Sequence, residues 1–459
     1  MSSYSLLTES ARCALSELRN VLQQPDPLPD VCFAIHDGKV HDPLGAGSYI
    51  FREDYVPSLM RYLGLPLQES EFVTPQSSTT AVIHIGAQPN NSPHAGTIVV
   101  FILAFLIARE IKKVYGELRE GDVSEDFGIW MNDFKILVRL DLVDTAPDNE
   151  LGREHEGIMY QRSQRYTQAH RSLLPDYEEI IQSAADFVGG TIPYEISDQT
   201  SLTTMPCIPR IIDAIVADRE RLGRELAPTT KALGMRCACP RLGCGWTEKH
   251  GRKNQYSVDA SGIATISFYC PDHGYHSITT SNPADVARLE FNTPLRNLVR
   301  AFAFGIDTTV SREAARTTTG AGKEQARECV HMRVTGADYA GTYSDQLLWR
   351  QLLLLPSAAG LGYITPPVIA YAPLVQDWAG SKLSKSLYVK EGAYKYLRDT
   401  GMGYLLSFSE MKANGRDHRI LFGEVARWLE EPKKLFRSYS IDYIHRIFED
   451  SRQKSLKQY

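Results

Sequence analysis

The sequence predicts an α/β fold built around a doubly wound parallel sheet. Ala81–Ile85 is a short β-branched run, which is the pattern of a buried strand. Gly96–Lys113 reads as a long apolar helix, and Phe127–Met131 reads as a second strand that ends in Asn132 and Asp133. Strand, loop, helix and strand in this order form the βαβ unit of nucleotide-binding sheets.

Composition limits the classes of protein that the chain can belong to. Its 459 residues are 43% hydrophobic and 23% charged, with a net charge of -5. These values are ordinary for a globular chain of about three domains, and they exclude a wholly disordered, collagen-like or coiled-coil protein. No apolar run reaches the roughly 18 residues of a membrane span, and the first residues lack the pattern of a secretory signal. We therefore expect a cytoplasmic protein with no membrane partner.

The chain divides into five predicted segments. Leu151–Leu233 is helical and rich in Arg, Glu and Gln, whereas Met235–Ser281 has short β-like runs between Cys, Gly and His. Alternating α/β character returns after Phe291, with a helix near Ser344–Leu355 and a strand near Pro367–Ala372. The predicted segments are a helical extension (1–78), the first half of the α/β domain with a helical insertion (79–233), a zinc-ribbon-like insertion (234–282), the second half of the α/β domain (283–386) and a short helical tail (387–459).

The loop between the first strand and the long helix suits phosphate. It runs from Gln88 to Thr97, and the following helix start offers free N–H groups and the positive end of its dipole. Gly96 permits close approach of a ligand, and His94 can donate to a phosphate oxygen. By itself this pattern more often marks a capped helix start with a surface histidine.

A second loop carries two lysines among hydroxyl groups, Lys382-Leu383-Ser384-Lys385-Ser386. Such a loop can fold over a triphosphate and neutralise the charge that develops on it. Read alone, it is also compatible with a solvated basic loop.

The cysteine-rich block predicts a structural zinc ion. Cys239 and Cys244 form one short pair, and Cys270 and His273 form another after 25 intervening residues. Two such pairs on two turns are what a tetrahedral zinc ribbon needs. Cys237 could replace Cys239 as a ligand, and His276 could replace His273.

Taken together, the two loops resemble the signatures of class I aminoacyl-tRNA synthetases. His94-Ala95-Gly96-Thr97 looks like the HIGH signature with threonine in its last position, and Lys382–Ser386 looks like KMSKS with leucine for methionine. Ile83-His84-Ile85-Gly86 also reads like the first signature, but it lies inside the predicted strand, so we treat it as a decoy.

The resemblance is closest to class I lysyl-tRNA synthetases and covers Val82–Ser386, including Trp130–Phe134, the zinc-like insertion and Gly336–Ser344. It implies a Rossmann-type catalytic domain that uses ATP, an amino acid and the acceptor end of tRNA. The residues that it implies are His94, Gly96, Lys382 and Lys385 at ATP phosphates, Gly336 and Asp338 near the ribose, and Asp133 beside a cationic amino-acid side chain. Asn90, Ser92, Thr97 and Tyr343 complete the predicted binding set, with Ser92 and Tyr343 as candidates for a base or nucleophile by location alone.

Three functions fit these expectations. The region after Ser386 is much shorter than the helical anticodon-binding region of that family, which disfavours an anticodon-dependent synthetase. The first function is tRNA-dependent joining of aminoacyl groups, arginyl first, into a cyclodipeptide, as in the fungal arginine-containing cyclodipeptide synthases. The second is an ATP-dependent ligase that activates an amino acid of the Lys or Arg type, which retention of Lys382 and Lys385 favours. The third is a non-catalytic tRNA-binding paralogue, which retention of both loops disfavours.

Overall fold

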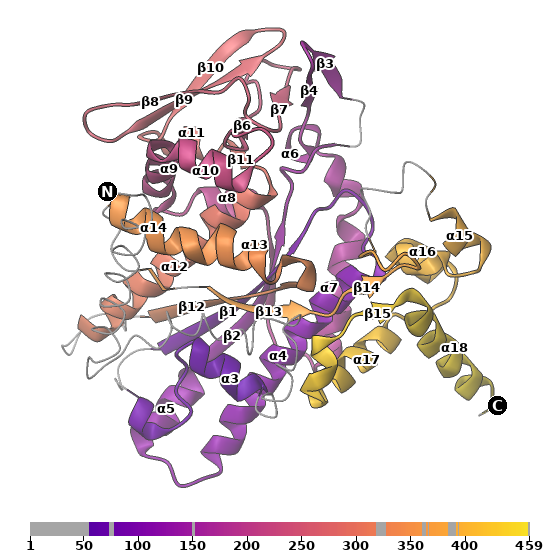
Figure 1. Ribbon diagram of the computed structural model, residues 1–459. Helices are drawn as coiled ribbons and strands as arrows, with labels where there is room; N and C mark the ends of the chain where they lie inside the picture. Colours follow the sequence, from indigo (N-terminus) through magenta and orange to yellow (C-terminus); the bar gives the residue numbers. More distant parts are fainter. Residues whose placement is uncertain are drawn as a thin grey trace, which may run out of the picture.

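The computed structural model describes residues 55–72, 78–148, 152–317, 327–359, 364–365, 367–383, 392 and 394–457. Its centre is a sheet of five strands that pair in parallel throughout (Figure 1). In spatial order these strands are β13 (Val368–Ala372), β12 (Arg327–Gly336), β1 (Ser78–Ala87), β2 (Lys135–Leu142) and β5 (Tyr194–Ser197). The predicted doubly wound α/β class is confirmed.

The strand order places a crevice at one edge of the sheet. Counted along the chain, the five strands are arranged 3-2-1-4-5, which is the order of a Rossmann-type sheet. The order reverses between β1 and β12, and ligands of such sheets bind at the carboxyl ends of the strands beside this point. The end of β1 at Ala87 and the end of β12 at Gly336 therefore mark where a ligand is expected.

Two hydrophobic cores lie on the two faces of the sheet. On one face Ala81, Ile83 and Ile85 of β1 pack with the long central helix, while Val82, His84 and Gly86 alternate with them along the strand. The helices that pack in this first core include α3 (Tyr55–Tyr62), α4 (Ala95–Arg119), α5 (Glu125–Asp133), α7 (Leu174–Phe187) and α17 (Arg419–Glu430). The helices of the second core are α9 (Ile208–Ala217), α10 (Arg219–Leu226), α11 (Pro283–Val286), α12 (Thr293–Thr317) and α14 (Arg350–Ala359).

The predicted strand at Phe127–Met131 is wrong, because these residues lie in helix α5. Ser124 caps this helix by accepting from the N–H of Phe127 at 3.4 Å, and Glu125 and Asp126 occupy its first turn. Phe127, Trp130 and Met131 are buried at helical spacing, whereas Ile129 is exposed. The second strand begins only at Lys135.

The region predicted as helices before the cysteine block also holds strands. The edge strand β5 belongs to the main sheet, and a small sheet combines β3 (Arg153–His155), β4 (Ile158–Gln161) and β7 (Thr247–Glu248). The short helices of this region are α6 (Gln164–Thr167) and α8 (Gln199–Thr203). The β-rich insertion itself consists of β6 (Met235–Cys237) paired with β11 (Leu289–Phe291), and of β8 (Gln255–Val258), β9 (Ala264–Cys270) and β10 (Gly274–Thr279). It lies above the sheet in Figure 1.

The C-terminal helices return to the main domain and pack against it. Figure 1 shows α17 beside α4 and α7, and Leu421, Phe422, Val425 and Trp428 of α17 belong to the first core. Strand β14 (Val375–Gln376), just before the lysine loop, pairs in parallel with β15 (Tyr439–Ser440). The remaining elements are α13 (Thr342–Ser344), a π-helical turn (Asp345–Trp349), α15 (Lys395–Asp399), α16 (Phe408–Ala413) and α18 (Ile441–Lys457). None of the helices in the described parts of the chain is long and apolar enough to span a membrane.

Candidate active site

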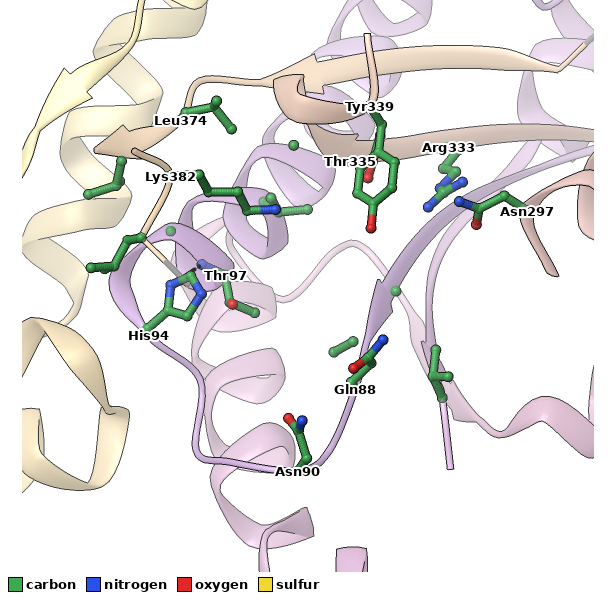
Figure 2. A pocket seen from close by; sticks show the side chains of 18 of the residues that line it. Gln88, Asn90, His94, Thr97, Asn297, Arg333, Thr335, Tyr339, Leu374 and Lys382 are labelled. Atoms are coloured by element: carbon green, nitrogen blue, oxygen red, sulfur yellow. Dashed lines mark hydrogen bonds between the residues drawn. The ribbon is translucent and has the colours of Figure 1, made fainter. Parts of the chain in front are cut away.

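A cavity of about 270 Å³ lies at the carboxyl ends of β1 and β12, where the strand order reverses. It is lined by both sequence motifs, with His94 and Thr97 from the start of α4 and Lys382 from the second loop (Figure 2). Asn90 and Gly336 line it as well. Segments nearly 300 residues apart in the sequence therefore form one site, as the class I resemblance requires.

His94 is the N-cap of helix α4. Its ring Nδ1 accepts from the backbone N–H of Thr97 at 3.3 Å, and the residue is only 8% exposed. Gly96 leaves room for the His94 ring, because a Cβ atom at position 96 would lie 3.1 Å from its Cε1 atom, which is a tight contact. The histidine is thus fixed at a helix start that faces the cavity, where an anion is stabilised by the free N–H groups and the helix dipole.

Lys382 is held over the cavity by Asp338. The Lys382 ammonium lies 2.6 Å from Oδ2 of Asp338 and 5.5 Å from the centre of the Tyr339 ring. Asp338 in turn packs against the backbone of Gly336, where an added Cβ atom would meet Oδ1 of Asp338 at 2.5 Å. The glycine and the aspartate predicted beside the ribose therefore act here by positioning the lysine.

The far wall of the cavity is strongly cationic. Arg296, Arg300 and Arg333 line it, and Figure 2 shows Arg333 and Asn297 at the opposite end from His94 and Lys382. Arg296 and Arg300 are 6% and 4% exposed. Nε of Arg296, one terminal nitrogen of Arg300 and Nε of Arg333 have no hydrogen-bond partner among the described residues.

No carboxylate balances this charge at the cavity surface, since none of its described lining residues is Asp or Glu. The nearest carboxylate recorded for Arg300 is Asp141, 3.9 Å from its Nε. Burial, and then the neighbouring Arg300, lower the pKa of Arg296. Arg296 is buried and its Nε has no hydrogen-bond partner among the described residues, which is costly unless an anion joins it, so the wall suits a phosphate or a carboxylate.

Two other predicted residues have structural duties. The Ser92 hydroxyl accepts from the N–H of Ser409 at 3.1 Å and is also bonded to Asp176, so it ties the loop to α16 and α7. The Tyr343 hydroxyl accepts from the side chain of Asn297 at 2.7 Å, and burial raises its pKa. A phenol with a raised pKa stays protonated near neutral pH, which argues against Tyr343 as a base.

Asp133 lies far from the position predicted for it. It is the last residue of helix α5 and is exposed, and β2 runs from Lys135 towards Leu142. Asp133 therefore lies beside the amino end of β2, whereas the cavity is at the carboxyl ends of the strands. The expected pairing of Asp133 with a cationic amino acid in this site is wrong. Lys385 lies outside the described residues.

The predicted zinc ligands converge in the β-rich insertion. The ligand atoms of Cys239, Cys244, Cys270 and His273 all lie within 4.8 Å of one another. His273 Nδ1 is 3.5 Å from Cys239 Sγ and 3.6 Å from Cys270 Sγ, and the sulfurs of Cys244 and Cys270 are 3.5 Å apart. These separations fit the edges of a tetrahedron with metal bonds of about 2.0–2.3 Å. The four residues could hold zinc.

The alternative ligands do not join this group. The Cys237 thiol contacts the carbonyl oxygen of Ala238 at 3.7 Å, and His276 Nε2 contacts the carbonyl oxygen of Cys237 at 3.3 Å. Arg162 holds the loop that carries Cys244 in place, because it donates to the carbonyl oxygen of Cys244 at 2.7 Å and stacks on Trp246.

Sequence reasoning missed the arginine wall. A usable signal was present, since Arg296 and Arg300 stand four residues apart within the apolar helix Leu295–Phe304. Cations at helical spacing on a buried face need a partner, and of these two arginines only Arg300 has a carboxylate partner among the described residues, Asp141 at 3.9 Å. Arg333 gave no comparable signal, because a polar residue that alternates with Met332 and Val334 is ordinary for a strand.

The sequence matches no protein-family model and no curated protein. Solved structures with some likeness include glutamate-tRNA ligase from Elizabethkingia meningosepticum, at 12% identity and a TM-score of 0.24 over 68% of this chain and 52% of that one. They also include a putative arginyl-tRNA synthetase from Campylobacter jejuni (10%, TM-score 0.23, 78% and 67%) and the Thermus thermophilus arginyl-tRNA synthetase (11%, TM-score 0.23, 81% and 60%). The chain spans about half the length of the glutamate enzyme that it matches. At these values the function has to be inferred from the cavity itself.

Proposed function

We propose that this protein is an enzyme that binds the acceptor ends of aminoacyl-tRNAs and joins their aminoacyl groups into a cyclodipeptide. The observation that carries the proposal is that His94 and Lys382, from the two signature-like loops, line one cavity at the switch point of the sheet. Two loops that the sequence alone leaves ambiguous are much harder to explain as unrelated surface features when they share a site.

The charge of the cavity supports a phosphate-bearing substrate. Lys382, which is paired with Asp338, and the three arginines supply cationic groups, and none of the described lining residues is itself acidic. The 3′ end of tRNA carries such phosphates beside its terminal adenosine. Contacts of this kind position an RNA end without reading its sequence.

The reaction needs no further source of energy once the tRNA is charged. The amine of one aminoacyl group attacks the ester carbonyl of the other, so that an amide C–N bond forms and the ester C–O bond to the tRNA breaks. The ribose oxygen leaves with the proton that the amine loses, and a second attack of the same kind closes the ring. Most of the rate enhancement then comes from holding two esters in register. Cationic groups at the cavity can stabilise the oxyanion that forms at each carbonyl.

The identity of the amino acid that the tRNA carries is also a proposal. Arginyl-tRNA is the first substrate to test on the resemblance, but Asp133 does not provide an acidic partner at this site. A guanidinium side chain would be repelled by Arg296 and Arg300, whereas a carboxylate would pair with them. Glutamyl- and aspartyl-tRNA are therefore the second substrates to test.

A second candidate is an ATP-dependent ligase that activates a free amino acid. It is favoured by the separation of the cationic groups, with His94 and Lys382 at one end of the cavity and Arg333 at the other. One end could take a triphosphate and the other the carboxylate of the amino acid.

We also propose a structural zinc ion in the β-rich insertion, held by Cys239, Cys244, Cys270 and His273. All four positions of a tetrahedron are then filled by protein, so the ion would fold the insertion and take no part in the reaction.

Purified protein given charged tRNAs tests the proposal. Diketopiperazine released from arginyl- or glutamyl-tRNA without ATP, and abolished by ribonuclease, would support it. Product formed from free amino acids and ATP after ribonuclease treatment, together with ATP–pyrophosphate exchange, would replace it with the ligase.

A further inference from the structure

A polar chain crosses the face of the sheet opposite α4, and it meets the arginine wall at Asp141. Asp307 of α12, His331 of β12, His84 of β1, Asp141 of β2 and Ser197 of β5 contact one another in that order. The separations are 2.8 Å for Asp307 Oδ2 to His331 Nε2, 2.9 Å for His331 Nδ1 to His84 Nε2, 3.1 Å for His84 Nδ1 to Asp141 Oδ2, and 2.9 Å for Asp141 Oδ1 to Ser197 Oγ. His84, which belongs to the signature-like sequence inside β1, is therefore the central residue of this chain.

The directions of these hydrogen bonds can be followed along the chain. The Asp141 carboxylate accepts from Nδ1–H of His84, so the Nε2 atom of neutral His84 accepts from Nδ1–H of His331. Nε2 of His331 then faces the carboxylate of Asp307, 2.8 Å away. Either a proton or a metal ion can join these two atoms.

The sulfur atom of Cys329 lies beside the same pair, Asp307 and His331. Cys329 stands two residues before His331 on β12, so both side chains lie on one face of the strand. Its sulfur is 3.5 Å from His331 Nε2, and the ligand atoms of Asp307, Cys329 and His331 all lie within 4.8 Å of one another. Phe304 stacks on both imidazole rings, at 4.0 Å from His84 and 4.6 Å from His331, and fixes their orientation.

We propose that Asp307, Cys329 and His331 form a second metal site, for Zn²⁺ or a similar divalent transition ion, with an open coordination position. A thiolate, an imidazole and a carboxylate are the ligands that such ions take in proteins. The Cys–His separation already fits tetrahedral bonds. The Asp–His separation needs to widen by about 0.5 Å to reach the edge of a tetrahedron with bonds near 2.0 Å. The Asp307 side chain is 42% exposed and has room for that movement.

The surroundings suit an open site rather than a closed one. The three residues line a separate cavity of about 240 Å³, which Asp198 and Arg300 also line. Three protein ligands beside a cavity leave the fourth position for water or a substrate atom. His84 and Asp141 form the outer support of His331, as a carboxylate does behind a metal-bound histidine. Arg300 lines both this cavity and the one that holds His94, so the two sites share a wall.

Metal stoichiometry tests the proposal. Native mass spectrometry of protein loaded with Zn²⁺ is expected to show that Asp307→Asn and Cys329→Ser each lose one equivalent of metal relative to the parent chain. Asp198→Asn is the matched control, because Asp198 lines the same cavity outside the triad and asparagine preserves its cap on α8. That variant should keep the full complement. His84→Gln should weaken the affinity of this equivalent by about 10–100-fold.

A measurement on the parent chain covers the case in which a variant fails to fold. Alkylation of each cysteine, mapped by peptide mass spectrometry, should slow at Cys329 when Zn²⁺ is added and stay unchanged at Cys207, a free cysteine outside both groups. Unchanged alkylation at Cys329, or a full metal complement in folded Asp307→Asn and Cys329→Ser, would overturn the proposal. The positive charge between Asp307 and His331 would then be a proton.

Discussion

The ammonium group of Lys382 lies 2.6 Å from the carboxylate of Asp338, although the two residues come from different loops. Side chains of both are partly exposed, so the pair adds little to folding stability. Its value is positional, because it fixes the lysine over a cavity whose described lining includes no Asp or Glu.

Replacing this lysine should therefore damage activity much more than stability. Lys382→Ala is expected to lower the rate of product release from charged tRNA by roughly 10²-fold, the usual cost of removing one group that stabilises developing negative charge. Its melting temperature should stay close to that of the parent chain. Lys395→Ala is the control, because Lys395 is an exposed lysine paired with Asp399 away from the cavity. Equal rates in the two variants would remove Lys382 from the site.

Two substitutions at His94 can separate its two duties. His94→Ala should destabilise the fold by about 1 kcal/mol through loss of the cap on α4, and should also lose activity. His94→Asn supplies another good capping group, so it should keep most of the stability and still lose activity. Chemical denaturation and product release measure the two effects. An asparagine variant with full activity would reduce His94 to a helix cap.

The arginine wall predicts a gain of stability on mutation. Arg296→Met keeps the bulk of the side chain and removes an unpaired buried charge, so the ligand-free variant should melt at or above the temperature of the parent chain. Pyrophosphate or ATP should raise the melting temperature of the parent chain and have much less effect on the variant.

Arg288→Met is the control for this experiment, since Arg288 is part of a more exposed pair with Asp285 outside the cavity. It should respond to pyrophosphate like the parent chain. A ligand-free Arg296→Met protein that melts well below the Arg288→Met protein, with its pyrophosphate response intact, would contradict the assignment of the wall to an anion.

The zinc ribbon predicts a contrast between two buried cysteines of the insertion. Cys270→Ser should lose one equivalent of zinc and be less stable, because metal binding and folding of such insertions are coupled. Cys237→Ser should keep that equivalent, since Cys237 lies outside the ligand group. Metal analysis after purification without chelator measures both, and identical zinc contents would show that the ligand set is wrong.

The hydrogen bonds that join Asp176 to Ser92 and Ser409 predict that the stability of the fold depends on pH. Although burial opposes it, hydrogen bonds from Ser409, Ser92 and Lys412 lower the pKa of Asp176. A carboxyl group whose pKa is lower in the folded state adds stability above its unfolded pKa near 4, and this contribution disappears as pH falls through the folded value. The melting temperature of Asp176→Asn should therefore lie below that of the parent chain at pH 7, and the difference should shrink below about pH 4. A difference that stays constant down to pH 3 would exclude this role.

Local patterns predicted the centre of the fold and one end of the site. β1, α4 and the loop around His94 were predictable, because the β-branched run, the helical spacing of apolar residues and the helix-start pattern each involve residues that are neighbours in the sequence. The apolar residues of Phe127–Met131 favour a strand in the sequence pattern. The structure instead follows the helix-start signal of the N-cap Ser124 and the acidic residues Glu125 and Asp126. The ligand group in the insertion followed from spacing, since each pair of ligands lies on one turn.

The remaining features depend on contacts between distant segments. Arg296 and Arg333 meet only because α12 packs beside β12. The tautomer of His84 has meaning only once Asp141 and His331 lie on either side of it. Cys329 carries no local signal, because a single cysteine between a glutamate and a valine is typical of an ordinary buried residue.

The hydrogen bonds that fix the loop before His94 to helix α16 can form only late in synthesis of the chain. The N–H of Phe408 donates to the carbonyl oxygen of Pro93 at 2.7 Å, and the partners Ser409 and Ser92 are separated by 317 residues. At translation rates of about 5–20 residues per second, the helix that clamps this loop is synthesised roughly 15–60 s after the loop itself. A nascent chain on the ribosome therefore holds an unclamped loop until α16 has been synthesised, and Ser92 and Pro93 gain these partners only then. Binding of the proposed phosphate-bearing substrate beside His94 would be delayed to the same point.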